Sequence, residues 1–397
     1  MTSYEIRQVA GQAMLDALYP LTNYAFTSTP PLPARDAWYE RVGQRRGVTC
    51  FAAYDGAVPV ACAQSTAMTQ NVRGALLGMG AVWGVTTHPA ARRRGLCRQL
   101  LTRLVVSMRE SGEVVAGLYP FRESFYERFG WVTFPQLRRA TFSPTALAPL
   151  LEQEIEGEIE LLPIGDALSD YRVVLERVQQ ATHGMALVRD APLPASVGES
   201  AWVALARDEG TPIGALVYRL TGERVADFTM QVWHLCCASS QARYLLLQWI
   251  ARHIDQASSV ELRSAPSDRP ETWLSDLKPH IETTHIAPMG RVVDVAGLSG
   301  IAVGPGCVTV HVRDALCPWN EGVWRFEGRG GRLVVAPLPE ASATDGELTI
   351  RAVSALVYGT HDPADFPFRG WVSGPAPLLK ALDAMFPRAL PFMYEMY

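Results

Sequence analysis

The stretch from residue 82 to residue 98 combines residue types that can hold a phosphate, and it reads VWGVTTHPAARRRGLCR. Its apolar, β-branched start predicts a strand, Pro89 ends that strand, and Gly95 lies in a turn before a helix begins. The backbone N–H groups at 93 to 98 would lack partners inside that helix, and the helix dipole is positive at this end. We therefore predict an anion site, best suited to a pyrophosphate.

Two small residues would keep this site open. Gly95 would let a phosphate approach the backbone, and Cys97 is small enough not to obstruct it. The alternative is an ordinary strand–helix connection that carries a solvated cluster of surface arginines. The glycine alone does not decide between the two interpretations.

The flanking sequence predicts the elements that would position this turn. Residues 48–87 contain apolar runs around a Tyr54–Asp55–Gly56 turn, which is typical of strands. After the turn, apolar residues recur every four positions as far as about Ser111, which predicts an amphipathic helix packed on a sheet, and this stripe consists of Leu96, Leu100, Leu104 and Met108. The run EVVAGLYP predicts a further strand, so the fold class is a mixed α/β layer.

The rest of the chain predicts two more domains. Residues 201–237 are strand-like and residues 240–254 helical, in the same order as the first domain but without its glycine-rich turn. From about Arg291 alternating strands follow, with short helices near 350–357 and 376–385. We predict three domains, at 1–150, 151–290 and 291–397.

Composition excludes several classes of protein. The chain of 397 residues has a net charge of −4 and is not basic enough for general nucleic-acid binding. Its two lysines, Lys278 and Lys380, lie outside any Gly-rich GK[ST] context, which argues against a P-loop. Seven cysteines without a C-x-x-C indicate neither a disulfide framework nor a zinc cluster, so no metal is expected.

The sequence also predicts where the protein is found. Glu5 and Arg7 stand where a signal peptide would be apolar. The longest uncharged runs, 74–91 and 295–312, are interrupted by Gly, Pro and Thr. We expect a soluble, cytoplasmic protein that binds neither membranes nor nucleic acid.

The whole turn resembles the coenzyme-A-binding motif of the GCN5-related N-acetyltransferases (GNAT), V-x-V-x-P-x-x-R-x-x-G-x-[GA]. Its positions are filled here by Val85, Thr87, Pro89, Arg92, Gly95 and Cys97, with Cys97 in place of the usual small residue. The resemblance implies acetyl-CoA as co-substrate, with a splayed strand whose backbone at 85 to 87 binds the pantetheine arm. Expected cofactor contacts are Val85, Thr86, Thr87, Arg92, Arg93, Arg94, Gly95, Leu96, Cys97, Arg98, Phe121 and Arg122.

More specifically, PAARRRGL with YERFG resembles the enhanced intracellular survival (Eis) family of acetyltransferases. The stretches MGRVVDV at 289–295 and CPWNEGVWR at 317–325 are similar to that family's C-terminal domain. The resemblance implies two tandem GNAT-type mixed-sheet domains, the second degenerate, and a C-terminal sterol-carrier-protein-2-like α+β domain. It also implies a homo-oligomer, a hexamer.

The segment FRESFYERFG at 121–130 resembles the family's F-Y-x-x-x-G motif, in which the tyrosine lies beside the coenzyme A sulfur. Tyr126 would then be the general acid that protonates the departing thiolate. The resemblance implies that the base is the C-terminal carboxylate, here of Tyr397. If the base is elsewhere, Glu123 and Glu127 are next in line.

Residues 20–48 are expected to form the lip of the acceptor site. They include the aromatic residues Tyr24, Phe26, Trp38 and Tyr39 and the acidic residues Asp36 and Glu40, and Trp83 on the cofactor strand is expected to face the same cavity. From these we take Phe26, Asp36, Trp38 and Trp83 as substrate residues, although each aromatic could equally be core. Relatives that modify aminoglycosides carry more carboxylates here, which puts multi-site aminoglycoside acetylation in doubt.

His88, in the turn before the predicted pyrophosphate site, is interpreted as a surface turn residue.

These expectations together predict an N-acetyltransferase that transfers the acetyl group of acetyl-CoA directly to a primary amine of a small molecule or to a lysine side chain. The alternative is a non-catalytic acyl-CoA or lipid-binding protein that uses the sterol-carrier-like domain. A deep apolar tunnel there, with the chain end far from Tyr126, would favour that alternative. A regulator that acts through protein contacts has no sequence feature of its own.

Overall fold

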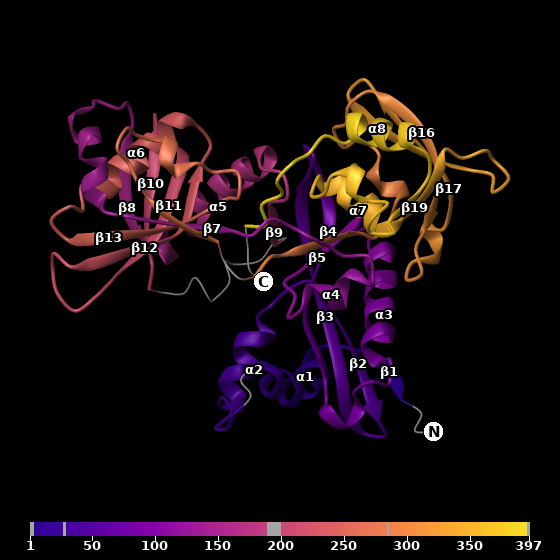
Figure 1. Ribbon diagram of the computed structural model, residues 1–397. Coiled ribbons are helices and arrows are strands. Elements are labelled where there is room, and N and C mark those ends of the chain that lie inside the picture. The colour runs from indigo at the N-terminus through magenta and orange to yellow at the C-terminus, as the bar shows by residue number, and fades with distance from the viewer. Residues whose placement is uncertain (1–3, 27–28, 189–199, 284–285, 395–397) are drawn as a thin grey trace. The chain divides into compact units, whose positions relative to one another are not determined.

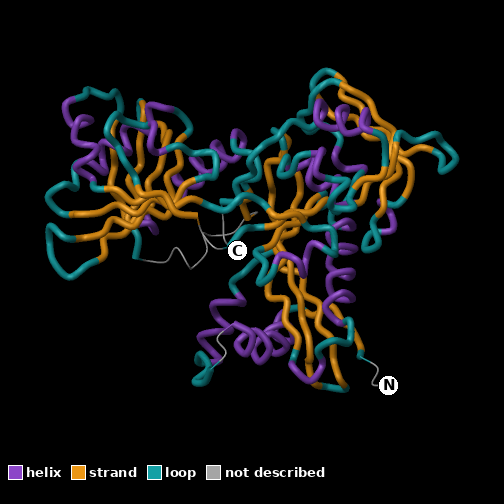
Figure 2. Tube along the Cα trace, in the orientation of Figure 1, coloured by secondary structure: helices purple, strands orange, loops and turns teal. Residues whose placement is uncertain are grey.

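The computed structural model describes residues 4–26, 29–188, 200–283 and 286–394. The chain forms two compact units, which mix helices and strands (Figure 2). The first consists of Met1–Phe134, His183–Ala191 and Pro288–Tyr397, and the second of Pro135–Thr182 and Pro192–Ala287. The predicted α/β class is confirmed, and the domain boundaries at 150 and 290 stay predictions.

The first unit contains an eight-stranded sheet that takes strands from three parts of the chain. Its order is β1 (Glu5–Val9), β2 (Val48–Asp55), β3 (Val58–Val72), β4 (Ala75–Thr87), β5 (Val115–Leu118), β15 (Met289–Val292) and β6 (Val132–Thr133), and β9 (Ala186–Val188) pairs with β3. The sequence predicts strands from about Arg291 but assigns them to the third domain, so the place of β15 in this sheet is a difference from the expectation. The strand β15 lies antiparallel between β5 and β6 and so ties the C-terminal segment into this sheet.

Helices cover both faces of this sheet (Figure 1). On one face α1 (Gly11–Phe26) and α2 (Arg35–Gly43) share a buried apolar cluster with β2 and β3. On the other face α3 (Leu96–Glu110) and the short α4 (Glu123–Glu127) share a second cluster. The predicted stripe is confirmed, because Leu96, Leu100, Leu104 and Met108 are all buried in it.

The second unit has its own seven-stranded sheet. The order is β14 (His280–Thr283), β7 (Arg138–Phe142), β13 (Ala257–Ser264), β12 (Phe228–Cys237), β11 (Thr211–Thr221), β10 (Trp202–Asp208) and β8 (Glu158–Pro163), with helices α5 (Ile164–Ala181) and α6 (Ser240–Ala251). As predicted, α6 follows β12 without a glycine-rich turn. The side chain of Ser239 caps α6 by accepting a hydrogen bond from the Ala242 N–H. One of the free N–H groups at the start of this helix is therefore already bound within the protein.

The C-terminal part of the first unit contains a five-stranded sheet and two helices. The order is β18 (Arg332–Leu338), β17 (Gly322–Arg329), β16 (Gly306–Arg313), β19 (Gly346–Thr349) and β20 (Val372–Ser373), with α7 (Ile350–Tyr358) and α8 (Ala376–Met385). The two predicted short helices are therefore confirmed. Helix α7 is buried almost all round, which is typical of a helix with protein on every side.

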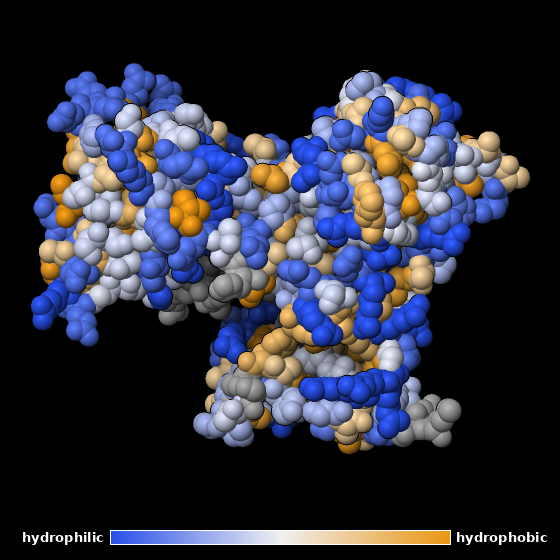
Figure 3. Space-filling model, in the orientation of Figure 1, coloured by the Kyte–Doolittle hydropathy of each residue, from blue (hydrophilic) through white to orange (hydrophobic). Residues whose placement is uncertain are grey.

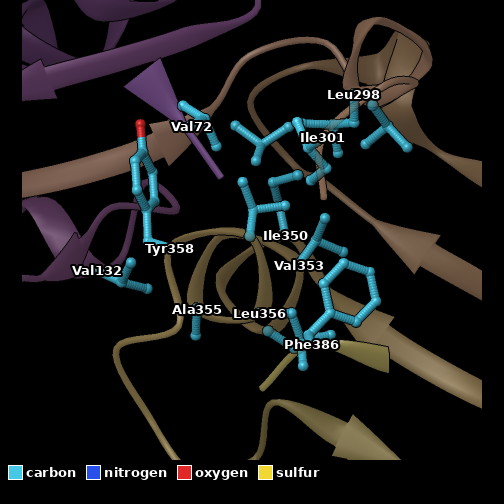
Figure 4. Close-up of a cluster of buried hydrophobic side chains, with 14 of the residues drawn as sticks. Val72, Val132, Leu298, Ile301, Ile350, Val353, Ala355, Leu356, Tyr358 and Phe386 are labelled. Atoms are coloured by element: carbon cyan, nitrogen blue, oxygen red, sulfur yellow. The ribbon is translucent and has the colours of Figure 1, made fainter. Parts of the chain in front are cut away.

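One apolar core joins this C-terminal part to the first sheet. Val72 and Val132 of the first sheet pack in it with Ile350, Val353 and Leu356 of α7 (Figure 4). These side chains are at most 5% exposed. Since close-packed interiors hold their parts rigidly, the end of the C-terminal part is held in a defined place relative to the first sheet.

A buried ion pair adds to this connection. Arg291 on β15 donates from Nη2 to both carboxylate oxygens of Asp314, at 2.8 and 2.6 Å, and both residues are almost fully buried.

Among the described residues no helix is long and apolar enough to cross a membrane.

Candidate functional site

Strand β5 is short and pairs only with the middle of β4. Their parallel pairing runs from Met79 opposite Val115 to Val82 opposite Leu118. Beyond that point β4 continues to Thr87, and no described strand pairs with it on the β5 side, whereas β3 still pairs with it on the other side. The backbone groups at 85 to 87 that face away from β3 are therefore available to an extended ligand, as the predicted splay requires.

A bulge shapes β4 at this opening. The register between β3 and β4 shifts between Cys62 and Gln64, and Gly84 has a φ of +59°. This positive φ favours glycine, and a Cβ at Gly84 would lie 2.4 Å from Nε2 of Gln64, so any other residue would also displace the Gln64 side chain. Bulges of this kind re-aim the backbone next to active sites.

The turn after β4 ends in an uncapped helix start. Gly95 has a φ of +76° and no side chain that could cap α3. The first hydrogen bond of the helix joins the Gln99 N–H to the Gly95 carbonyl at 3.1 Å. The N–H groups of Leu96, Cys97 and Arg98 precede that bond and lack partners inside the helix, so they can donate to an anion, as the predicted site requires.

Arginines surround this helix start and are not neutralised by carboxylates. Arg92, Arg93, Arg94 and Arg98 are exposed, and none forms an ion pair within the described ranges. Arg92 donates from Nε to the Thr87 carbonyl at 3.3 Å, which holds its side chain beside the turn. His88 is exposed, and its Nδ1 accepts from the Ala90 N–H at 3.3 Å, which fits the expected turn role.

Tyr126 lies near this opening, on α4. Its ring packs 5.1 Å from that of Phe125 and 6.2 Å from that of Trp131, in the cluster that also holds Leu96 and Leu118. The side chain is 4% exposed, and within the described part of the chain its hydroxyl has no hydrogen-bond partner. Burial, together with the Cys97 thiol nearby, raises the pKa of Tyr126, so it stays protonated at neutral pH.

The residues before α4 face solvent. Phe121 is 70% exposed, although its ring lies 5.9 Å from that of Tyr126, and Arg122 is exposed as well. In the space-filling view, apolar (orange) side chains gather around the area of α4 and β3, among hydrophilic ones (Figure 3).

Tyr397, the expected source of the base, lies outside the described residues. The described tail before it reaches the opening. The Phe392 N–H donates to the His183 carbonyl at 2.9 Å, and the Tyr119 hydroxyl donates to the Met393 carbonyl at 3.4 Å. Tyr119 directly follows β5, so the tail passes the point where β5 leaves β4.

The expected lip residues differ in exposure. Phe26, at the end of α1, is 69% exposed, and Asp36, in the first turn of α2, is exposed. Trp38 is only 7% exposed and packs with Leu18 and Val42 in the core below α1 and α2. Trp38 is therefore a core residue in this structure and does not offer an open surface to an acceptor.

Trp83 is the first residue of β4 beyond the last β5 pair, and it is partly buried on the face of α1 and α2. Its Nε1 donates to Oγ1 of Thr66 at 2.9 Å, and the guanidinium of Arg45 lies 4.1 Å from its ring centroid. Burial and the nearby Arg41 lower the pKa of Arg45, which has no carboxylate partner among the described residues. This wall of the lip therefore carries positive charge beside an aromatic ring.

Sequence reasoning did not find three residues at the opening: Arg45, Gln64 and Tyr119. The sequence around each of them contains no motif. Each reaches the site only through strand register or through tertiary packing. Strand β3 is buried on both faces around Gln64, so alternation along the strand gives no signal for this residue.

Family models match all three parts of the chain. An acetyltransferase (GNAT) domain model matches residues 5–134, a second one matches residues 175–292, and a sterol carrier protein domain model matches residues 298–394. Among curated proteins, an uncharacterized N-acetyltransferase of Streptomyces coelicolor is 25% identical over 285 residues, and one of Streptomyces avermitilis is 26% identical over 283. These matches cover 64% and 65% of the chain, and 65% and 66% of the length of the two relatives.

Solved structures share the fold along the whole chain. A GCN5-related N-acetyltransferase from Anabaena variabilis superposes with a TM-score of 0.83 at 16% identity, over 99% of this chain and 100% of that one. One from Kribbella flavida gives 0.81 at 22%, over 99% of each chain. Eis1 from Mycobacterium abscessus gives 0.76 at 20%, over 99% of this chain and 100% of that one.

The expected architecture is thus confirmed, namely two tandem GNAT domains and a C-terminal sterol-carrier-protein-2-like domain in an Eis-like fold. Together with the open helix start after β4, these matches show that the chain belongs to the GCN5-related N-acetyltransferase superfamily.

Proposed function

We propose that the protein is an acetyl-CoA-dependent N-acetyltransferase that acts on a primary amine of a small molecule or on a lysine side chain. The observation that carries the proposal is the continuous path from the unpaired edge of β4 to the uncapped start of α3. The first can bind the amides of a pantetheine arm, and the second can bind a pyrophosphate. The exposed arginines 92 to 94 and 98 would add charge-assisted contacts to phosphates.

In this proposal Tyr126 protonates the thiolate that leaves when the amine attacks the thioester. A raised pKa by itself makes the tyrosine a weaker acid, yet the same burial makes a thiolate more basic. The Cys97 thiol beside it shows this effect, since burial raises its pKa to about 11. Burial therefore raises the pKa of the donor, Tyr126, and that of the acceptor, the leaving thiolate, in the same direction. The difference between the two pKa values stays small, so proton transfer between the groups is close to neutral in free energy.

The proposed base is the terminal carboxylate that the resemblance implies at Tyr397. Support comes from the tail before it, which is buried at Met393 and Tyr394 and is bound by Tyr119 next to the opening. A carboxylate shielded from bulk water would have a raised pKa and could accept a proton from an ammonium group, through water. Glu123 is exposed and its neighbour Glu127 partly so, and both flank Tyr126, which keeps them as the alternative base.

Two observations favour this enzyme over a lipid-binding protein. The apolar side chains of the C-terminal part pack into one core with those of the first sheet, around a helix that is buried almost all round. The tail also runs toward the opening near Tyr126 rather than away from it.

The positive charge of Arg45 beside the Trp83 ring favours the binding of acceptors that carry few positive charges, which agrees with the doubt about aminoglycosides. A cytoplasmic location and a hexamer stay predictions.

The test is a turnover screen of the full chain with acetyl-CoA and a panel of amines, in which released thiol is measured. The variant Tyr126→Phe keeps the ring and removes the donor, so kcat should fall by roughly 100-fold or more while affinity for acetyl-CoA changes little. Phe125→Leu, which alters the neighbouring ring without removing a hydroxyl, is the matched control and should retain far more activity. A Tyr126→Phe enzyme with kcat within threefold of wild type would exclude Tyr126 as the acid.

A further inference from the structure

Gln64, in the middle of β3, is a buried amide without a hydrogen-bond partner. Its side chain is 0% exposed, and neither Nε2 nor Oε1 has a partner among the described residues. A buried amide that is left unsatisfied costs folding free energy, and such a group needs an explanation. A bound ligand that supplies the missing hydrogen bonds would be such an explanation.

The strand register places this amide at the edge of the opening. Gln64 pairs with Trp83, the first residue of β4 beyond the last pair with β5. Its carboxamide lies where Gly84 has no side chain, because a Cβ there would be 2.4 Å from Nε2. The amide thus takes the place of a β4 side chain at the point where the two strands part.

The polar groups next to Gln64 already have partners. The Trp83 indole donates to Thr66, and the Cys62 thiol lies 2.9 Å from the Thr86 hydroxyl. Gln64 therefore differs from its neighbours, since its donor and its acceptor are both still available. A ligand that satisfies it must offer an acceptor and a donor in one place.

We propose that the carboxamide of Gln64 contacts the reacting groups themselves, with Oε1 accepting from an N–H of the acceptor amine and Nε2 donating to the acetyl carbonyl oxygen. This inference rests on the proposed function, because the meeting of an amine with a thioester supplies both groups at this opening. Gln64 neither gains nor loses a proton in this role, and it forms no covalent bond. It orients the amine toward the carbonyl carbon and stabilises the charge that develops on the carbonyl oxygen.

The test compares Gln64→Met with Gln70→Met in the full-length protein. Gln70 lies on the same strand, is equally buried and is fully paired, since its Nε2 donates to the Gly184 carbonyl at 2.9 Å and its Oε1 accepts from the Tyr358 hydroxyl at 2.8 Å. Methionine keeps the length of glutamine and removes its polar atoms. Without ligand, Gln64→Met should melt at or above the wild-type temperature, whereas Gln70→Met should melt below it.

With acetyl-CoA and the best amine of the panel, Gln64→Met should lose at least tenfold in kcat/KM for the amine, while its Kd for acetyl-CoA stays within threefold of wild type. A variant that keeps wild-type kcat/KM overturns the role of Gln64. A fall in melting temperature like that of Gln70→Met overturns it as well, because Gln64 would then be a structural residue. If the wild-type chain transfers no acetyl group to any amine, the proposed function itself fails.

Discussion

Replacing Gly95 by tryptophan should separate cofactor binding from folding. Gly95 has a φ of +76°, and a Cβ there would meet no atom closer than 3.9 Å, so the side chain has room but the backbone is strained. A non-glycine residue in this conformation costs about 1–2 kcal/mol, which lowers the melting temperature by a few degrees. Because Gly95 directly precedes the N–H groups of 96 to 98, we expect an indole there to compete with a phosphate for the space beside them.

The loss of affinity follows from those N–H groups. Each hydrogen bond from an amide to a charged phosphate is worth about 1.5–3 kcal/mol, so the loss of two costs about 3–6 kcal/mol. Affinity for acetyl-CoA should then fall by more than about 100-fold, since 1.4 kcal/mol corresponds to a factor of ten. Isothermal titration calorimetry with acetyl-CoA measures this loss directly.

Gly112, just beyond the other end of α3, supplies a matched control. It also has a φ of +76°, and a Cβ there would meet nothing within 4 Å. Gly112→Trp should therefore lower the melting temperature by about as much as Gly95→Trp, yet bind acetyl-CoA like the wild type. A folded Gly95→Trp protein that binds acetyl-CoA within threefold of wild type would refute the assignment of the cofactor site.

The remaining predictions concern the chain end, the buried ion pair and a buried histidine. Adding one residue after Tyr397 moves a terminal carboxylate by about 3.5 Å, so turnover should fall at least tenfold with acetyl-CoA binding intact, and full activity would place the base elsewhere. Arg291→Met leaves Asp314 buried without its cation and should cost about 3–5 kcal/mol in urea unfolding, more than Arg291→Met combined with Asp314→Asn. Burial lowers the pKa of His183 to about 4, below its unfolded value of about 6.5, so protonation favours unfolding and stability should fall as pH drops from 6.5 toward 4. His183→Asn should reduce that slope, and an unchanged slope would contradict the assignment.

The sequence by itself determined the local elements of the proposed cofactor site. The strand before Pro89, the turn at Gly95 and the apolar stripe of α3 each depend on residues a few positions apart, and all appear in the structure. Tyr126 could be named because its neighbours in sequence form the motif. Local propensity and periodicity act within a single element, so they can be read without knowledge of the fold.

The tertiary structure decided which residues from distant parts of the chain meet at that site. β15 enters the first sheet from position 289, and the Tyr119 hydroxyl binds the tail at Met393. Trp38 could have lined the lip on its residue type, but packing against α1 buries it. Strand register placed Gln64 beside Gly84, and no local pattern marks that meeting. Such contacts depend on the burial of apolar surface over the whole unit, which assigns each strand its neighbour only when all the strands are present.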